Sequence, residues 1–148
     1  MPVSRNSVFL NTVSRNIVSR EIIVPQNDRL NVSRSMNLPH SPGIRAGDFI
    51  FLSGMLSTDP ATGERSPGTM AHETRQTLAN MQHMLESAGS SLDRVVKITV
   101  LLYDMLEFDS MNAVYRQFFP QDPPARTTCG VQLGAGMKIE IECVALVG

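Results

Sequence analysis

The sequence predicts an α+β fold in which two helices pack on one face of a mixed β-sheet. Three observations support this: short β-branched and apolar runs typical of strands, two segments whose apolar residues recur every three or four positions, and the order of these segments. Strands come first, followed by a helix, a strand, a second helix and a closing pair of strands. With 148 residues, 42% of them hydrophobic, the chain can build one such core.

The first half of the chain supplies two strands, a turn and a helix. Glu21–Val24 is β-branched and stops at a proline, and Phe49–Leu52 is an apolar run between glycines, so both are expected to be strands. Proline and glycine in Asp59–Glu64 indicate a turn. An amphipathic helix that ends at Gly89 is predicted by apolar and small residues at helical spacing. These are Met70, Thr74, Thr77, Leu78, Met81, Met84, Leu85 and Ala88.

The second half supplies the remaining strands and the second helix. Val95–Leu102 is a near-continuous apolar run suited to a central strand. Apolar residues at helical spacing from Phe108 to Phe118 predict the second helix, which the prolines after it end. The closing strands, 126–133 and 137–146, are joined by two glycines and an alanine, which predicts a hairpin.

Residues 1–19 are predicted to be a poorly ordered extension before a single domain at 20–148. The extension is rich in arginine and serine and contains no acidic residue, a composition that organelle transit peptides share. No stretch approaches the ~20 apolar residues of a membrane-spanning helix, so no membrane partner is expected. We expect a cytoplasmic protein, with organelle targeting by residues 1–20 left open.

The composition also excludes several kinds of partner. From Glu21 onward ten basic residues face fourteen acidic ones, which argues against nucleic-acid binding. No metal-ligand spacing, phosphate-binding glycine loop or nucleophile elbow is present, so we expect neither metal nor cofactor. Both cysteines, Cys129 and Cys143, lie in apolar strand-like runs and are expected to be buried thiols.

Charged side chains near the C-terminus are the best candidates for chemistry. Arg126 begins a strand, and its guanidinium can bind a planar carboxylate through two parallel hydrogen bonds. Glu140 and Glu142 alternate with isoleucines, so both carboxylates point to one face. The predicted hairpin places the arginine and the glutamates on adjoining strands. Two plainer alternatives stay open: Arg126 pairs with Glu140 or Asp122, and the glutamates are ordinary solvated positions.

Seven motifs between about Glu21 and Gly148 occur in the order and near the spacing of one known family. They are Asp48–Gly54, Asp59–Gly63, Thr77–Met81, Val95–Val100, Met111–Phe119, Pro124–Val131 and Lys138–Glu142. This pattern resembles the reactive intermediate deaminase (Rid) family, also known as the YjgF/YER057c/UK114 family. The resemblance implies a chorismate-mutase-like fold and a homotrimer with sites between subunits. An apolar sheet face without helices independently predicts association.

The resemblance also implies a function and residues for it. Members hydrolyse enamines and imines of the 2-aminoacrylate type to 2-keto acids and ammonia, without a cofactor. The implied catalytic residues are Arg126, which anchors the substrate carboxylate, and Glu140, which orients the attacking water. The implied substrate-binding positions, besides Arg126, are His40, Ser53, Gly54, Tyr103, Asn112 and Thr128.

Three departures from the family leave the substrate open. His40 stands where many members have a tyrosine, Thr128 stands where a cysteine is common, and the connection from Arg126 to Glu140 is one residue shorter than in the best-known members. A pathway-specific enzyme, such as a 2-aminomuconate deaminase, is therefore one alternative. A non-catalytic trimer that binds ligands or acts like a chaperone is another, because fold alone does not establish function. The acidic body argues against ribonuclease activity.

Overall fold

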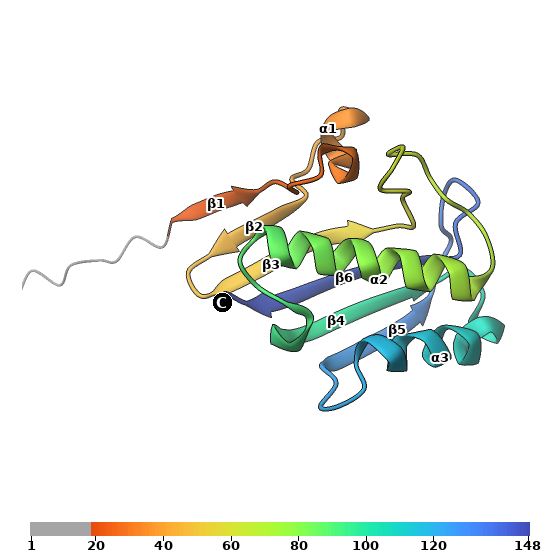
Figure 1. Cartoon of the computed structure of the whole chain (residues 1–148). Helices are drawn as coiled ribbons and strands as arrows, with labels where there is room; N and C mark the ends of the chain where they lie inside the picture. The colour runs from red at the N-terminus through yellow and green to blue at the C-terminus, as the bar shows by residue number, and fades with distance from the viewer. Residues whose placement is uncertain (1–18) are drawn as a thin grey trace, which may run out of the picture.

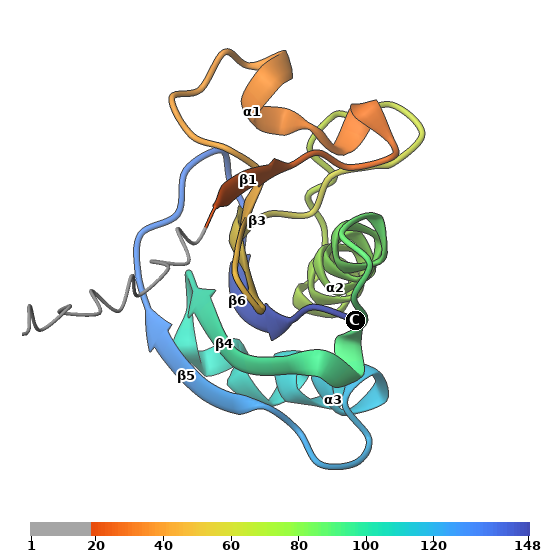
Figure 2. The same cartoon turned by 90° about the vertical axis from the view of Figure 1, so that its left-hand side faces the viewer.

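The structure, a computed structural model, describes residues 19–148, which form a mixed sheet with two long helices on one face (Figures 1 and 2). The strand order is β1-β2-β3-β6-β4-β5, and every neighbouring pair is antiparallel except β4 and β5. The predicted α+β fold is confirmed. The strands are β1 (Arg20–Ile23), β2 (Gly43–Ala46), β3 (Phe49–Met55), β4 (Val95–Leu102), β5 (Ala125–Gly130) and β6 (Ile139–Leu146).

The two long helices are α2 (Met70–Ser87) and α3 (Phe108–Phe118). The Thr69 side chain caps α2 by accepting the backbone N–H of His72 at 3.1 Å. Gly89, with a φ of 74°, follows the end of α2 as the sequence predicts. None of the helices within residues 19–148 is long and apolar enough to cross a membrane. Four shorter elements complete the chain: η1 (Asp28–Leu30), α1 (Val32–Ser35), η2 (Leu92–Arg94) and η3 (Met105–Glu107).

The core lies between the helices and one face of the sheet. Along β6, Ile139 and Ile141 are fully buried on this face, while the residues between them point to the other face. From α2, Leu78 and Leu85 complete the same cluster. Each side chain of this size contributes ~1.5–3 kcal/mol when fully buried. The core therefore fixes which face of β6 each side chain occupies.

The predicted hairpin between the last two strands is wrong. β5 pairs with β4 in parallel, and β6 pairs with β3 and with the opposite edge of β4. The cause is the helical crossover through α3, which brings β5 back beside β4 in the same direction. The free edge of β4 then accepts β6. Arg126 and Glu140 consequently lie on strands that β4 separates.

The second face of the sheet is uncovered, and its β1–β3 side is apolar. Ile22, Phe49 and Phe51 are between 44% and 61% exposed there, and Leu146 lies opposite Phe49. Figure 2 shows that both long helices lie on the other side of the sheet.

Cys129 is exposed on edge strand β5, so the expectation that both cysteines are buried is wrong for this one.

The predicted extension at residues 1–19 lies, up to residue 18, outside the described residues. The sheet begins at Arg20, where the predicted domain begins.

Candidate functional site

Arg126 lies on β5 with its guanidinium held between this strand and α3. It pairs in register with the buried Ile98 and therefore faces the helical side of the sheet. Its Nη1 donates to Oδ1 of the buried Asn112 at 2.8 Å. The guanidinium carbon lies 4.6 Å from the ring centre of Tyr115 and 5.6 Å from that of Phe108. These contacts orient the fork and leave other N–H groups available to a carboxylate.

The sequence left open a pairing of Arg126 with Glu140 or Asp122. Within residues 19–148 the ion pairs are Arg34–Asp28 and Lys138–Glu107, and Arg126 is in neither. Its hydrogen-bonded partners are both neutral: the amide oxygen of Asn112 at 2.8 Å and, more weakly, the sulfur of Met111 at 3.9 Å. The arginine is therefore a half-buried cation that forms no ion pair with any of the residues that the structure describes.

Two buried oxygen atoms near Arg126 have no hydrogen-bond partner among residues 19–148. Thr128 is two positions along β5 and shares the face of Arg126, and its hydroxyl is fully enclosed. The hydroxyl of Tyr115 is enclosed as well, and burial raises the pKa of Tyr115 to about 12. Tyr115 is thus a neutral phenol at physiological pH, so its ring can stack on the arginine without adding a negative charge.

Glu140 lies on β6 and points to the uncovered face. A β-bulge interrupts the pairing of β3 with β6 between Leu52 and Met55, and Gly54 falls within it. The Glu140 carboxylate occupies the space in which any residue but glycine would place its Cβ at position 54. Glu142 shares this face but is more exposed, as the alternation predicts. The absence of a side chain at Gly54 therefore leaves room for the Glu140 carboxylate.

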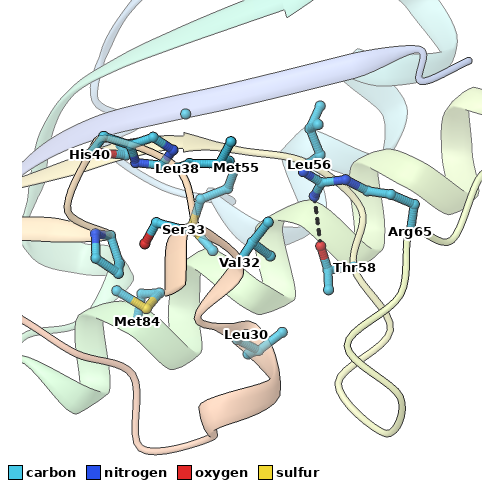
Figure 3. Close-up of a pocket in the computed structure, with 13 residues that line it drawn as sticks. Leu30, Val32, Ser33, Leu38, His40, Met55, Leu56, Thr58, Arg65 and Met84 are labelled. Atoms are coloured by element: carbon cyan, nitrogen blue, oxygen red, sulfur yellow. Dashed lines mark hydrogen bonds between the residues drawn. The ribbon is translucent and has the colours of Figure 1, made fainter. Parts of the chain in front are cut away.

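His40 and Ser53 line a cavity at the end of β3, together with Gly54 (Figure 3). The Ser53 hydroxyl donates to the carbonyl of Ser41 at 2.6 Å, and Nδ1 of His40 lies 3.3 Å from the same oxygen. The cavity has a volume of about 70 Å³, which is room for several water molecules or a small polar group. Three predicted site residues therefore gather here, near Glu140.

The structure thus divides the predicted site into two groups. Arg126, Asn112 and Thr128 lie on the helical side at edge strand β5, and Glu140 lies with Gly54 on the uncovered side. Tyr103 belongs to neither group in the protomer: it is 60% exposed beyond β4, and its backbone N–H donates to the carbonyl of Lys138.

Two further charged residues were not foreseen. Arg65 enters the cavity from the segment that follows the predicted turn, and its Nη1 donates to Oγ1 of Thr58 at 2.9 Å. The buried Glu73 carboxylate accepts the backbone N–H groups of Gly68 at 3.0 Å and Lys138 at 2.7 Å. The predicted turn at Asp59–Glu64 could have indicated the position of Arg65, because it folds residue 65 back against the end of β3.

Comparisons with known proteins agree with this architecture. The sequence profile of the family described as endoribonuclease L-PSP matches residues 33–147. The human 2-iminobutanoate/2-iminopropanoate deaminase is 40% identical over 111 residues, which cover 74% of this chain and 81% of the human protein. Reactive Intermediate Deaminase A, chloroplastic, of Arabidopsis thaliana is 35% identical over 144 residues, which cover 96% of this chain and 74% of that protein.

A solved structure is similar over most of the fold. The crystal structure of the YjgF gene product of Escherichia coli superposes with a TM-score of 0.75 at 33% identity. The similarity covers 85% of this chain and 98% of the bacterial one.

Proposed function

Because this chain belongs to the endoribonuclease L-PSP family, the family of the reactive intermediate deaminases, we propose that it hydrolyses enamines and imines of 2-amino acids to 2-oxo acids and ammonia. The names of the human and Arabidopsis relatives support this activity, which is also the one predicted from the sequence. The observation on this chain that carries the proposal is Arg126, which Asn112 and two aromatic rings orient while part of its fork stays free.

The reaction adds one water molecule to the imine carbon and breaks its bond to nitrogen. In our proposal Arg126 binds the carboxylate next to that carbon, and Glu140 orients the water and takes its proton. That proton goes to the nitrogen, which gives a carbinolamine; the second proton of the added water then passes from its hydroxyl to the nitrogen, which leaves as ammonia, and the carbon keeps the oxygen as a carbonyl. Such imines also hydrolyse slowly in water, so positioning the two reactants is sufficient catalysis.

We further propose that the complete site forms between copies of the chain in a homotrimer. Arg126 and Glu140 lie on opposite faces of the sheet and on strands that β4 separates, so one protomer does not bring them together. The uncovered apolar face, with Phe49 and Phe51, gives the copies a surface to bury. In this arrangement Arg126 of one copy faces Glu140 of an adjacent copy.

The word endoribonuclease in the family description does not match the charge of this chain. Ten basic against fourteen acidic residues from Glu21 to Gly148 do not provide the positive surface that a phosphate backbone requires. We therefore propose a small imino acid, and no nucleic acid, as the substrate.

For its location we propose the cytoplasm, with organelle import by residues 1–20 as the alternative. The Arabidopsis relative is named chloroplastic, which favours testing that alternative. Fluorescent fusions of residues 1–148 and 20–148 would separate the two: import of only the longer fusion would overturn the cytoplasmic proposal.

The activity is tested by generating 2-aminoacrylate with a serine dehydratase and following imine decay. We expect faster decay with the wild-type protein and no acceleration with Arg126→Ala, while Arg45→Ala, which removes an exposed arginine elsewhere, keeps full activity. No acceleration by the wild-type protein would contradict the proposal and favour a non-catalytic ligand-binding module.

A further inference from the structure

Arg65 is a cation that the proposed chemistry does not use. It is half-buried, and the one side-chain hydrogen bond that it forms with residues 19–148 is to the neutral hydroxyl of Thr58. Neither ion pair in the part of the chain that the structure describes includes it. A guanidinium carries five N–H donors, so most of this fork has no partner. Because burying an unpaired charge is unfavourable, a partly buried guanidinium with free N–H groups is suited to binding an anion.

The backbone around Arg65 is fixed. Thr58 and Arg65 form an isolated antiparallel bridge. Within the turn between them, the Asp59 N–H donates to the Glu64 carbonyl at 2.9 Å. The buried Asn80 on α2 holds the Thr58 carbonyl at 2.8 Å. The guanidinium therefore reaches the cavity from a turn whose backbone is held by hydrogen bonds.

Arg65 also lies close to the proposed catalytic carboxylate. It lines the same cavity as Gly54, against which Glu140 rests. Burial lowers the pKa of Arg65, and the negative charge of Glu140 acts in the opposite direction. Figure 3 shows Arg65 and His40 at opposite ends of this cavity.

The cavity has the size and polarity of a subsite. Its volume of about 70 Å³ is room for a carboxylate together with bound water. Polar groups from Ser33 and Thr58 share its wall with aliphatic side chains. A substrate whose reacting carbon lies at Glu140 would extend the end of its side chain into this space.

We propose that Arg65 binds a second carboxylate, so that the preferred substrates are short dicarboxylic 2-imino acids. This inference rests on the proposed function and specifies its substrate class. The first carboxylate is bound by Arg126, the imine carbon lies beside Glu140, and the distal carboxylate enters the cavity. Water adds to the imine carbon and ammonia leaves, which yields a dicarboxylic 2-oxo acid without any change of oxidation state.

The test compares two imines made in situ by amino-acid oxidases: 2-iminosuccinate from aspartate and 2-iminopropanoate from alanine. Residual imine is trapped with semicarbazide, and the ratio of the two kcat/KM values is the readout. We expect the wild-type protein to favour the dicarboxylic imine and Arg65→Met to lower this ratio roughly ten- to hundredfold, the size of a charge-assisted hydrogen bond. Arg65→Lys should recover part of the loss.

Arg45→Met is the matched control, because Arg45 is exposed on β2 and does not line the cavity. It should leave the ratio unchanged. Competitive inhibition by oxaloacetate, compared with pyruvate, gives a second readout that does not depend on turnover and should weaken in Arg65→Met.

The outcomes separate the two proposals. A wild-type protein that hydrolyses 2-iminopropanoate but shows no preference for 2-iminosuccinate, or an Arg65→Met variant with the wild-type ratio, overturns the second carboxylate site and leaves the deaminase proposal standing. A wild-type protein that hydrolyses neither imine overturns both.

Discussion

Mixing two inactive variants tests whether the site is shared between copies of the chain. Arg126→Ala removes the proposed carboxylate anchor, and Glu140→Ala removes the group that orients water. Each variant alone should be inactive, because every site in its oligomer lacks one of the two residues. When the variants exchange subunits, some sites will receive Arg126 from a Glu140→Ala chain and Glu140 from an Arg126→Ala chain.

The size of the recovery follows from the geometry. In a closed ring, each site takes Arg126 from one subunit and Glu140 from the next. At equal amounts and with random exchange, each requirement is met half of the time. About one quarter of the sites should therefore be intact, whatever the number of subunits in the ring. A site built within one chain would recover nothing.

The assay is imine decay after the two variants have been unfolded in urea together and refolded together. Variants refolded separately and mixed only afterwards serve as the control, since their subunits have not exchanged. Recovery of about one quarter of the wild-type rate is expected. Absence of any recovery, in a mixture whose mass shows hybrid oligomers, would refute the shared site.

Three further predictions concern single side chains. Gly54→Ala should lower kcat/KM by about tenfold or more, equivalent to ~1.4 kcal/mol. The stability against urea should change little, because the new methyl displaces only the flexible end of the Glu140 side chain. Wild-type kinetics in this variant would contradict the prediction. Glu73→Gln should lower the free energy of unfolding by ~1–3 kcal/mol in a urea titration, since the buried amide has one acceptor oxygen for the two backbone N–H groups that the carboxylate accepts; an unchanged midpoint would argue against that role. Folded Tyr115 has a pKa raised from 10.0 to about 12, so the unfolded chain loses this proton first and stability should fall from pH 10 to about 12. Tyr115→Phe should reduce that slope relative to the wild-type protein, and identical slopes would refute the assignment.

The regular elements could be predicted from the sequence because each carries its own local signal. The strand at Val95–Leu102 was predicted with the bounds that the structure shows, and Gly89 follows the end of α2 as expected. The pairing of the last strands could not be predicted, since a glycine-rich connection fits a hairpin and a longer crossing equally well. β5 and β6 are separated by β4 because α3 brings β5 back parallel to that strand.

The candidate site was predictable residue by residue but not in its arrangement. Alternation along β6 predicted that Glu140 and Glu142 share a face, and the structure agrees. That Arg126 occupies the opposite face depends on the register of β5 against β4, which local sequence does not encode. Arg65 was missed because its role arises from a turn that returns it to the end of β3.

If copies associate as proposed, the uncovered sheet face leaves the newly made chain open to wrong contacts until it has assembled. A chain can complete its helices and all six strands and still display Phe49 and Phe51 to water. Until it meets other copies, it can equally well meet chaperones, membranes or unrelated unfolded chains. The time from synthesis to activity would then be governed by how often copies encounter one another, so that slow expression, rather than slow folding, delays the first turnover.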